Sequence, residues 1–120
     1  MEKIQSYKEL HVWQKSMELV EEIYRIVRVL PKYELYILGS QMIRSAISIP
    51  ANIAEGWARN YRVEFARFLS ISYASALELE THLLISQKQY SEIDYEKAFR
   101  LLTEVEKMLS VFIIKIKNKN

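Results

Sequence analysis

Arginines with aromatic neighbours are the side chains of this sequence whose types and spacing best suit a binding chemistry. They lie in one short segment that comprises Arg59, Arg62 and Arg67, with Trp57 and Tyr61 interleaved. Guanidinium groups pair with phosphates and stack on bases, and aromatic rings stack on bases as well. Glu55 and Glu64 lie close enough in the sequence to neutralise part of the positive charge. The segment therefore indicates a weak binding surface for RNA or DNA.

A proline and several polar residues just before these arginines depart from a simple amphipathic helix. They are Pro50, Asn52, Glu55 and Gly56. In a structural interpretation, Asn52 satisfies the carbonyl of Ala46, which loses its helical donor at Pro50. Glu55 then pairs with an arginine or caps the next helix. In a functional interpretation, the same polar groups extend the arginine surface. We adopt the structural interpretation for these four residues.

Metal chemistry is not supported by the spacing of the acidic and histidine residues. A di-iron bundle needs Glu-x-x-His on each of two helices and two further glutamates. His82 follows Glu78 by four positions and Glu80 by two, and His11 lies alone. The sequence has no cysteine, which excludes thiolate metal sites and disulfides. We therefore expect no metal site.

Covalent catalysis and phosphate transfer lack their usual sequence features here. A serine nucleophile needs a base within reach and a third group that orients the base. The serines of this chain instead fall on helical patterns, where small residues serve close packing. No glycine-rich turn precedes a predicted helix, so the phosphate-cradling motifs are absent. The chain is therefore predicted to have no enzymatic activity, no small-molecule substrate and no cofactor.

The composition indicates one small all-α domain that covers residues 1–120. Two glycines and two prolines are too few for the turns of a β-sandwich or an α/β fold. The net charge is only +2, which is low for a protein dedicated to nucleic acid. A small basic run near the end of the chain consists of Lys115, Lys117 and Lys119. The frequent charges near the start of the chain exclude a signal peptide, and no apolar run is long enough for a membrane helix. We expect a cytoplasmic protein.

Four amphipathic helices are predicted from apolar residues that recur at steps of three and four. They cover residues 8–30, 34–57, 61–88 and 94–116. Pro31 ends the first helix because it disfavours the α conformation of Leu30. Pro50 lies inside the second helix, and we predict a kink there because its ring presses on the carbonyl of Ala46. Short connections force neighbouring helices to be antiparallel, so the predicted fold is an antiparallel up-down four-helix bundle.

Three of the helices have a second apolar stripe beside the one expected to face the core. On the first helix, the predicted inner stripe is Leu10, Trp13, Met17, Val20, Tyr24 and Val27, and the second stripe is Leu19, Ile23, Ile26 and Leu30. The additional residues are Ile43, Ile47, Ala51 and Ala54 on the second helix, and Phe68, Ile71 and Ser75 on the third. A four-helix monomer buries one stripe per helix, so the extra stripes favour a homo-oligomer. Wider core faces in a monomer are the alternative.

Several segments, in order along nearly the whole chain, are similar to a known family. They comprise residues 6–10, 12–15, 48–56, 64–69 and 77–81. The most specific of them is residues 49–56, Ile-Pro-Ala-Asn-Ile-Ala-Glu-Gly. On these residues, the chain resembles the four-helix-bundle family of 23S rRNA-intervening-sequence proteins.

The resemblance implies an up-down bundle that assembles as a homopentamer and has no established enzymatic activity. It also implies a gene that lies, in some bacteria, within insertions of the large ribosomal RNA gene. Nucleic-acid binding is implied only by analogy with a similar pentameric bundle, the accessory protein of diversity-generating retroelements. The family usually has a glycine near Ala58 and a serine near Tyr61. Because this sequence differs there, we expect Asn60 to cap the third helix and the turn to be stiffer.

The residues and the resemblance together predict a non-enzymatic, homo-oligomeric helical bundle. The resemblance sets the expected number of subunits at five. The predicted partners are other copies of the chain and RNA or DNA, with no membrane. A protein-interaction scaffold that does not bind nucleic acid is the alternative.

Overall fold

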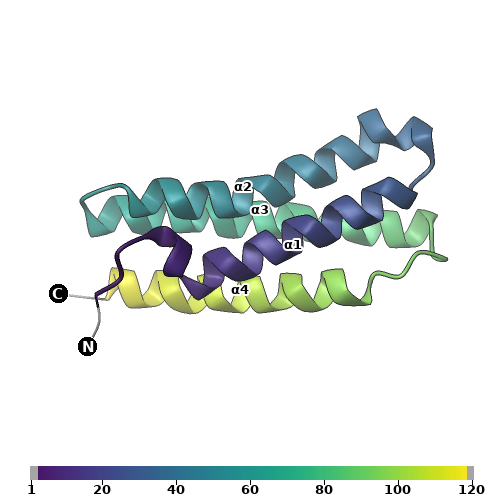
Figure 1. Ribbon diagram of the computed structural model, residues 1–120. Coiled ribbons are helices and arrows are strands. Elements are labelled where there is room, and N and C mark those ends of the chain that lie inside the picture. Colours follow the sequence, from purple (N-terminus) through teal and green to yellow (C-terminus); the bar gives the residue numbers. More distant parts are fainter. Residues whose placement is uncertain (1–2, 119–120) are drawn as a thin grey trace.

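The computed structural model describes residues 3–118 as a bundle of four long helices (Figure 1). These are α1 (His11–Val29), α2 (Ser40–Trp57), α3 (Arg62–Gln89) and α4 (Glu96–Lys117). Three short helical segments precede α1 and α2, namely η1 (Tyr7–Glu9), η2 (Lys32–Glu34) and η3 (Leu35–Gly39). Each long helix runs back along the one before it, so the α2–α3 turn and the end of α4 lie at the same end. The predicted all-α four-helix bundle is confirmed.

The first two helices begin later than the sequence pattern predicted. α1 begins at His11, because the backbone of Leu10 is extended (φ −72°, ψ 126°) and separates α1 from η1. α2 begins at Ser40, because residues 32–39 form the tighter turn η2 and the wider turn η3. Pro31 acts as predicted, since Leu30 before it is extended (ψ 155°) and α1 has ended.

The prediction that Asn60 caps the third helix is wrong. The residue directly before α3 is Tyr61, whose backbone is extended (φ −118°, ψ 134°) and whose side chain makes no capping hydrogen bond. A capping side chain must come from that position, so Asn60 lies one residue too early in the turn. Before α4, the carboxylate of Asp94 supports the start of the helix, because it accepts a hydrogen bond from the backbone N–H of Glu96 (3.0 Å).

The core is aliphatic and follows the length of the bundle. Its fully buried large side chains are Leu19, Ile23, Ile26, Met42, Ile49, Ile53, Leu69, Leu79, Leu83, Leu101, Leu102 and Leu109. Most of those from α2, α3 and α4 belong to the inner stripes that the sequence pattern predicts. These predicted stripes are Leu35, Leu38, Met42, Ala46, Ile49 and Ile53 on the second helix, Phe65, Leu69, Ser72, Ala76, Leu79 and Leu83 on the third, and Ala98, Leu101, Val105, Met108, Phe112 and Ile116 on the fourth. Leu35 is an exception, since it lies in η3 and is 44% exposed.

The core-facing side of α1 differs in part from the prediction, because Leu10 and Val27 of the predicted inner stripe are buried whereas its other members are not. The stripe that faces the core is Leu19, Ile23, Ile26 and Leu30. The stripe on the outer side of α1, fully or partly exposed, is Trp13, Met17, Val20 and Tyr24. The buried stripe is purely aliphatic, whereas Trp13 and Tyr24 have a polar N–H or O–H group that needs a partner when it is buried. The aliphatic stripe is therefore the one that gains most from leaving water.

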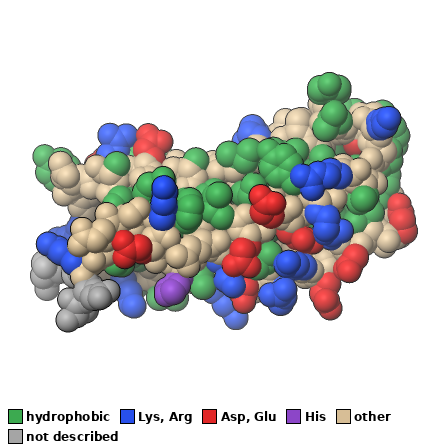
Figure 2. Space-filling view, in the orientation of Figure 1, with side chains coloured by type: hydrophobic (Ala, Val, Ile, Leu, Met, Phe, Trp, Pro, Cys, Tyr) green, Lys and Arg blue, Asp and Glu red, His purple; other side chains and the backbone are tan. Residues whose placement is uncertain are grey.

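Apolar side chains also remain on the outer surfaces of α2 and α3. Ile47 is 43% exposed and Ile71 is 38% exposed, and Ala51 is exposed as well. By contrast, Phe68 and Ser75 from the predicted second stripe of α3 are buried within the single chain. Figure 2 shows hydrophobic side chains gathered along the boundary of α1 and α2, while charges of both signs cover the lower part of the same view.

α2 continues through Pro50, which is buried. The prediction that Asn52 satisfies the carbonyl of Ala46 is wrong. The Asn52 amide instead donates to the carbonyl oxygen of Ser48 (2.8 Å) and to its hydroxyl (3.0 Å). Helical side chains point back toward the N-terminus by about one turn, which reaches Ser48 but not Ala46. The kink at Pro50 stays a prediction.

Candidate nucleic-acid interface

The α2–α3 turn brings two of the three predicted arginines to one aromatic ring. The guanidinium carbons of Arg59 and Arg67 lie 4.9 and 4.7 Å from the ring centroid of Phe68, which is buried. Arg59 Nη2 lies 3.2 Å from Glu55 Oε2. Arg67 Nη2 lies 3.2 Å from Glu64 Oε1. Each arginine therefore has both a carboxylate partner and a ring partner within the chain.

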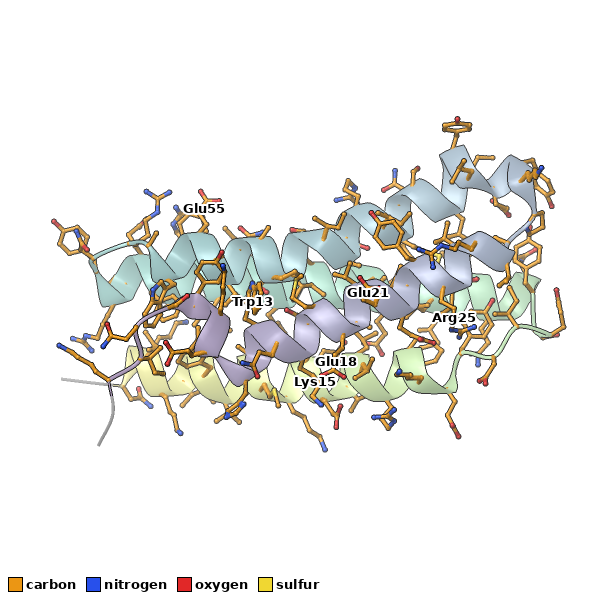
Figure 3. All side chains as sticks on the ribbon, in the orientation of Figure 1. Trp13, Lys15, Glu18, Glu21, Arg25 and Glu55 are labelled. Atoms are coloured by element: carbon orange, nitrogen blue, oxygen red, sulfur yellow. The ribbon has the colours of Figure 1, made fainter. Side chains whose placement is uncertain are left out.

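These ion pairs reduce the positive charge that the turn presents to a ligand. The hydrogen bond from Arg67 lowers the pKa of Glu64, and the charges of Arg67 and Arg59 lower it further. Glu64 is therefore ionised at neutral pH. Figure 3 shows Glu55 on the outer side of α2, pointing away from the bundle. Arg59 and Arg67 consequently add little net charge at this end.

Arg62 lies apart from this pair and faces the end of α4. Its guanidinium donates to the carbonyl of Ile116 (Nη1···O 3.4 Å). Together with Lys117, it lines an open cavity of about 700 Å³ between α3 and α4. Lys115 belongs to the same last turn of α4. Within residues 3–118, none of these three cations forms an ion pair with a carboxylate. We call Arg62, Lys115 and Lys117 the basic rim.

The part that α4 plays in this surface was missed by sequence reasoning. Lys115 and Lys117 looked like an isolated basic run, far along the chain from Arg62. The antiparallel course of α3 and α4 brings the start of one helix beside the end of the other. The predicted up-down topology already implied that the start of the third helix lies beside the end of the fourth. Comparing the charges at those two helix ends would have found the basic rim. Lys119 lies outside the described residues.

The two predicted aromatic residues have different surroundings. Tyr61 is 72% exposed and borders a shallow pocket of about 210 Å³ together with Arg59 and Arg62. Trp57 is partly buried and packs edge-to-face on Phe65, with ring centroids 6.3 Å apart. Tyr61 can therefore stack on a base beside Arg62, whereas Trp57 mainly fills the space under the turn.

Gly56 permits the close approach of α2 and α3 under this turn. A Cβ atom added at Gly56 would lie 2.7 Å from the Cβ of Phe68 and 3.0 Å from Cδ1 of Phe65. Two hydrogen bonds further along hold the same two helices together. The Ser48 and Ser75 hydroxyls lie 2.8 Å apart, and Ser72 Oγ donates to the carbonyl of Ile49 (2.9 Å). The segment around Pro50 therefore contributes contacts within the bundle.

One cluster has the residue types of a catalytic triad, but its serine is not accessible to a substrate. Ser45 Oγ lies 3.2 Å from His82 Nδ1, and His82 Nε2 lies 3.9 Å from Glu78 Oε2, which also pairs with Arg44. Burial lowers the pKa of His82, and the charge of Arg44 also lowers it while Glu78 opposes both. Ser45 is fully buried, and its hydroxyl donates to the carbonyl of Gln41 (2.9 Å). A serine in this position presents no nucleophile to a substrate.

The acidic residues of the bundle include one interacting pair, Glu80 and Glu106. Burial, together with a hydrogen bond and repulsion from Glu80, raises the pKa of Glu106 to about 7. Within residues 3–118, no group of three or more His, Cys, Asp or Glu residues is arranged to hold a metal ion. In the same range, no helix has both the length and the apolar character that membrane crossing requires.

Comparison with known proteins places the chain in a family and finds similar solved structures. A family model described as 23S rRNA-intervening sequence protein matches residues 8–111. Among solved structures, the chain is similar to a protein with unknown function from the S23 ribosomal protein family of Bacteroides thetaiotaomicron. The two are 28% identical with a TM-score of 0.74, over 85% of this chain and 97% of that chain. No curated protein matches.

Proposed function

The chain belongs to the 23S rRNA-intervening sequence protein family, and from this premise we propose that it is a non-enzymatic homo-oligomer that binds nucleic acid weakly in the cytoplasm. The observation that supports this most directly is the basic rim. Arg62 and Lys117 line one open cavity, Lys115 lies in the same last turn of α4, and none of the three has a carboxylate partner in the described chain. Phosphate groups are the natural partners of such unpaired cations.

The binding is weak because the basic rim contributes only three cations per chain. The net charge is only +2, and carboxylates within the chain neutralise Arg59 and Arg67. An oligomer repeats the basic rim once per subunit, so a polyanion can contact several rims at once. Tyr61 beside Arg62 adds a stacking surface that tolerates any base. The expected ligand is RNA or DNA without strong sequence preference.

Self-association is supported by apolar side chains that the single chain leaves in water. They lie on α1 at Met17, on α2 at Ile47 and on α3 at Ile71, and each is more than a third exposed. Large apolar patches on a soluble protein commonly mark contacts with a partner. The family resemblance implies five subunits. Light scattering coupled to size exclusion at micromolar concentration should give a mass several times 14.3 kDa; a monomer mass contradicts this part of the proposal.

Nucleic-acid binding is tested by its dependence on salt. Fluorescence anisotropy with a structured RNA and a duplex DNA, at about 50 mM and about 150 mM salt, gives the slope of log K against log [salt]. Each phosphate contact contributes about −0.9 to this slope on duplex DNA and about −0.7 on single strands. The double variant Arg62→Gln/Lys117→Gln should flatten the slope by about 1.5 and leave the oligomer unchanged.

A matched control removes the same charge from the opposite end of the bundle. Lys88 and Lys97 are both exposed, near the end of α3 and the start of α4. The variant Lys88→Gln/Lys97→Gln should retain the wild-type slope, because its substitutions lie far from the basic rim. If both double variants weaken binding equally, the interaction follows total charge and the basic rim is not the site. If the wild type binds neither polymer at low salt, the chain acts instead as a protein-interaction scaffold.

A further inference from the structure

The outer surfaces of α2 and α3 form a face that the single chain leaves uncovered. We define the α2–α3 face by its exposed and half-exposed residues, Arg44, Ile47, Ala51 and Glu55 on α2, and Arg67, Ile71, Ala74 and Glu78 on α3. Each helix therefore contributes one arginine, one isoleucine, one alanine and one glutamate. The face contains two positive and two negative charges and has no net charge.

Two contacts fix how these residues lie opposite one another. Arg44 pairs with Glu78 at one end of the face, and the Ser48 and Ser75 hydroxyls meet 2.8 Å apart near its middle. Because α2 and α3 run in opposite directions, one turn forward on α2 corresponds to one turn back on α3. Moving along the face therefore sets Ile47 opposite Ala74.

The same step, continued, sets Ala51 opposite Ile71 and Glu55 opposite Arg67. From one end to the other, α2 presents Arg, Ile, Ala and Glu, while α3 presents Glu, Ala, Ile and Arg. A rotation by 180° about an axis perpendicular to the face places each of these α2 residues on the α3 residue of the same type. The face consequently has an approximate internal two-fold symmetry, which follows from the residue types and their helical spacing.

This arrangement makes the face complementary to itself, and we propose that it pairs with the same face of a second copy of the chain. A two-fold axis that lies in the interface, parallel to the helices, sets α2 of one copy over α3 of the other. Each arginine then faces a glutamate, and each isoleucine faces the alanine of the other copy. The isoleucines fill the hollows beside the small alanines, while the charges at both ends fix the register.

The charged residues at the ends of the face are partly exposed to a second copy, although each has a partner within its own chain. Glu55 is paired with Arg59 and Arg67 with Glu64 within the chain, yet the Glu55 and Arg67 side chains are 56% and 55% exposed. Arg44 is 54% exposed. A polyanion is not the occupant of this face, because equal numbers of arginines and glutamates give it no attraction for phosphates.

The inference extends the homo-oligomer of the proposed function and rests on it. A two-fold contact is isologous and is complete after two copies. A ring of five subunits would therefore close through other surfaces, and the α2–α3 face would join two such rings. The outer stripe of α1, with Met17 41% exposed, is a separate apolar surface for contacts of that kind.

The experiment replaces one of the small alanines of the face with the large, positively charged arginine. Ala51 is exposed, so Ala51→Arg should leave the helical circular dichroism of the chain unchanged and should at least halve the mass measured by light scattering at the same concentration. The matched control is Thr103→Arg, which adds the same charge at an exposed position of α4 and should keep the wild-type mass. An Ala51→Arg variant that keeps the full mass of an oligomeric wild type overturns the inference and leaves the proposed oligomer standing. A monomeric wild type overturns both.

A charge exchange provides a second, independent readout. Arg44→Glu alone and Glu78→Arg alone each set like charges against each other between copies, so each should lower the mass. The two single variants mixed in equal amounts should recover the wild-type mass, because each charge then meets its opposite on the other copy. Failure of the mixture to recover, with both variants folded, contradicts the pairing.

Discussion

The two ends of the bundle use their polar side chains in different ways. At the end with the α1–α2 and α3–α4 connections, the Tyr90 hydroxyl donates to Glu34 Oε2 (2.5 Å) and lies 3.0 Å from the Tyr33 hydroxyl. Arg25 there donates to the carbonyl of Asp94 (2.7 Å). These contacts join segments that are far apart in the sequence. We call this the clasped end.

The opposite end, with the α2–α3 turn and the end of α4, keeps part of its charge unpaired. Arg62, Lys115 and Lys117 have no carboxylate partner in the described chain. We call it the open end. Polar groups that are satisfied within the chain contribute stability, whereas unpaired cations around a cavity are available to a ligand. The comparison predicts that substitutions at the clasped end change stability, whereas substitutions of the open-end cations change binding.

The largest loss of stability is expected from Arg25→Met at the clasped end. Arg25 donates from Nε (2.8 Å) and Nη2 (2.6 Å) to Glu22 Oε2, and the Glu22 side chain is only 8% exposed. Removing the guanidinium leaves a buried carboxylate without its partner, which costs about 3 kcal/mol. Urea unfolding measures the change. The double variant Glu22→Gln/Arg25→Met should recover part of the loss, and no recovery would mean that the ion pair is not the cause.

A smaller loss of stability is expected when either glycine is replaced by alanine. Because one glycine lies at each end, the two variants compare the ends directly. Gly56→Ala at the open end brings a Cβ to 2.7 Å from the Phe68 Cβ, which cannot move without its backbone. We expect a cost of about 2 kcal/mol, despite the intrinsic helix preference of alanine. Gly39→Ala at the clasped end meets a Val27 methyl at 3.1 Å and a carbonyl at 3.2 Å. It should cost less, because both contacts are longer than those at Gly56 and the valine side chain can shift. Equal thermal stabilities of the two variants would contradict the tight approach at Gly56.

The smallest of the three effects is expected from Tyr90→Phe. The substitution removes the hydrogen bonds to Glu34 and Tyr33 but retains the ring, so we expect a small loss of stability near neutral pH. The hydrogen bond to Glu34 raises the pKa of Tyr90, and the one with Tyr33 and burial raise it further. The folded chain therefore holds this proton more tightly than the unfolded chain. Its contribution is complete below the ordinary phenol pKa and is lost as the pH rises above it. The difference in melting temperature between wild type and variant should therefore be smaller at alkaline pH than at neutral pH. A difference that stays constant with pH would contradict this.

Much of the fold was predictable because it depends on local residue pattern. Periodic apolar residues and the scarcity of glycine and proline led to four helices, and Pro31 ended the first one as expected. The errors concern features for which the residue pattern allows two alternatives and favours neither. Either stripe of α1 satisfies the helical period, and only packing against α2 and α4 selects Leu19, Ile23 and Ile26 for the core. Likewise, the partner of Asn52 depends on side-chain direction, which spacing alone does not give.

The sequence by itself determined the helices, the lack of metal-site spacing and the presence of arginines beside aromatic residues near the α2–α3 turn. These follow from residue types and short-range spacing, which the chain keeps in any fold. Only the tertiary structure decided which arginines remain free. Arg59 and Arg67 pair with glutamates one helical turn away, whereas Arg62 meets Lys117 from the far end of the chain. The physical reason is that charge at a surface is a sum over neighbours in space, and antiparallel packing makes neighbours of residues that the sequence keeps apart.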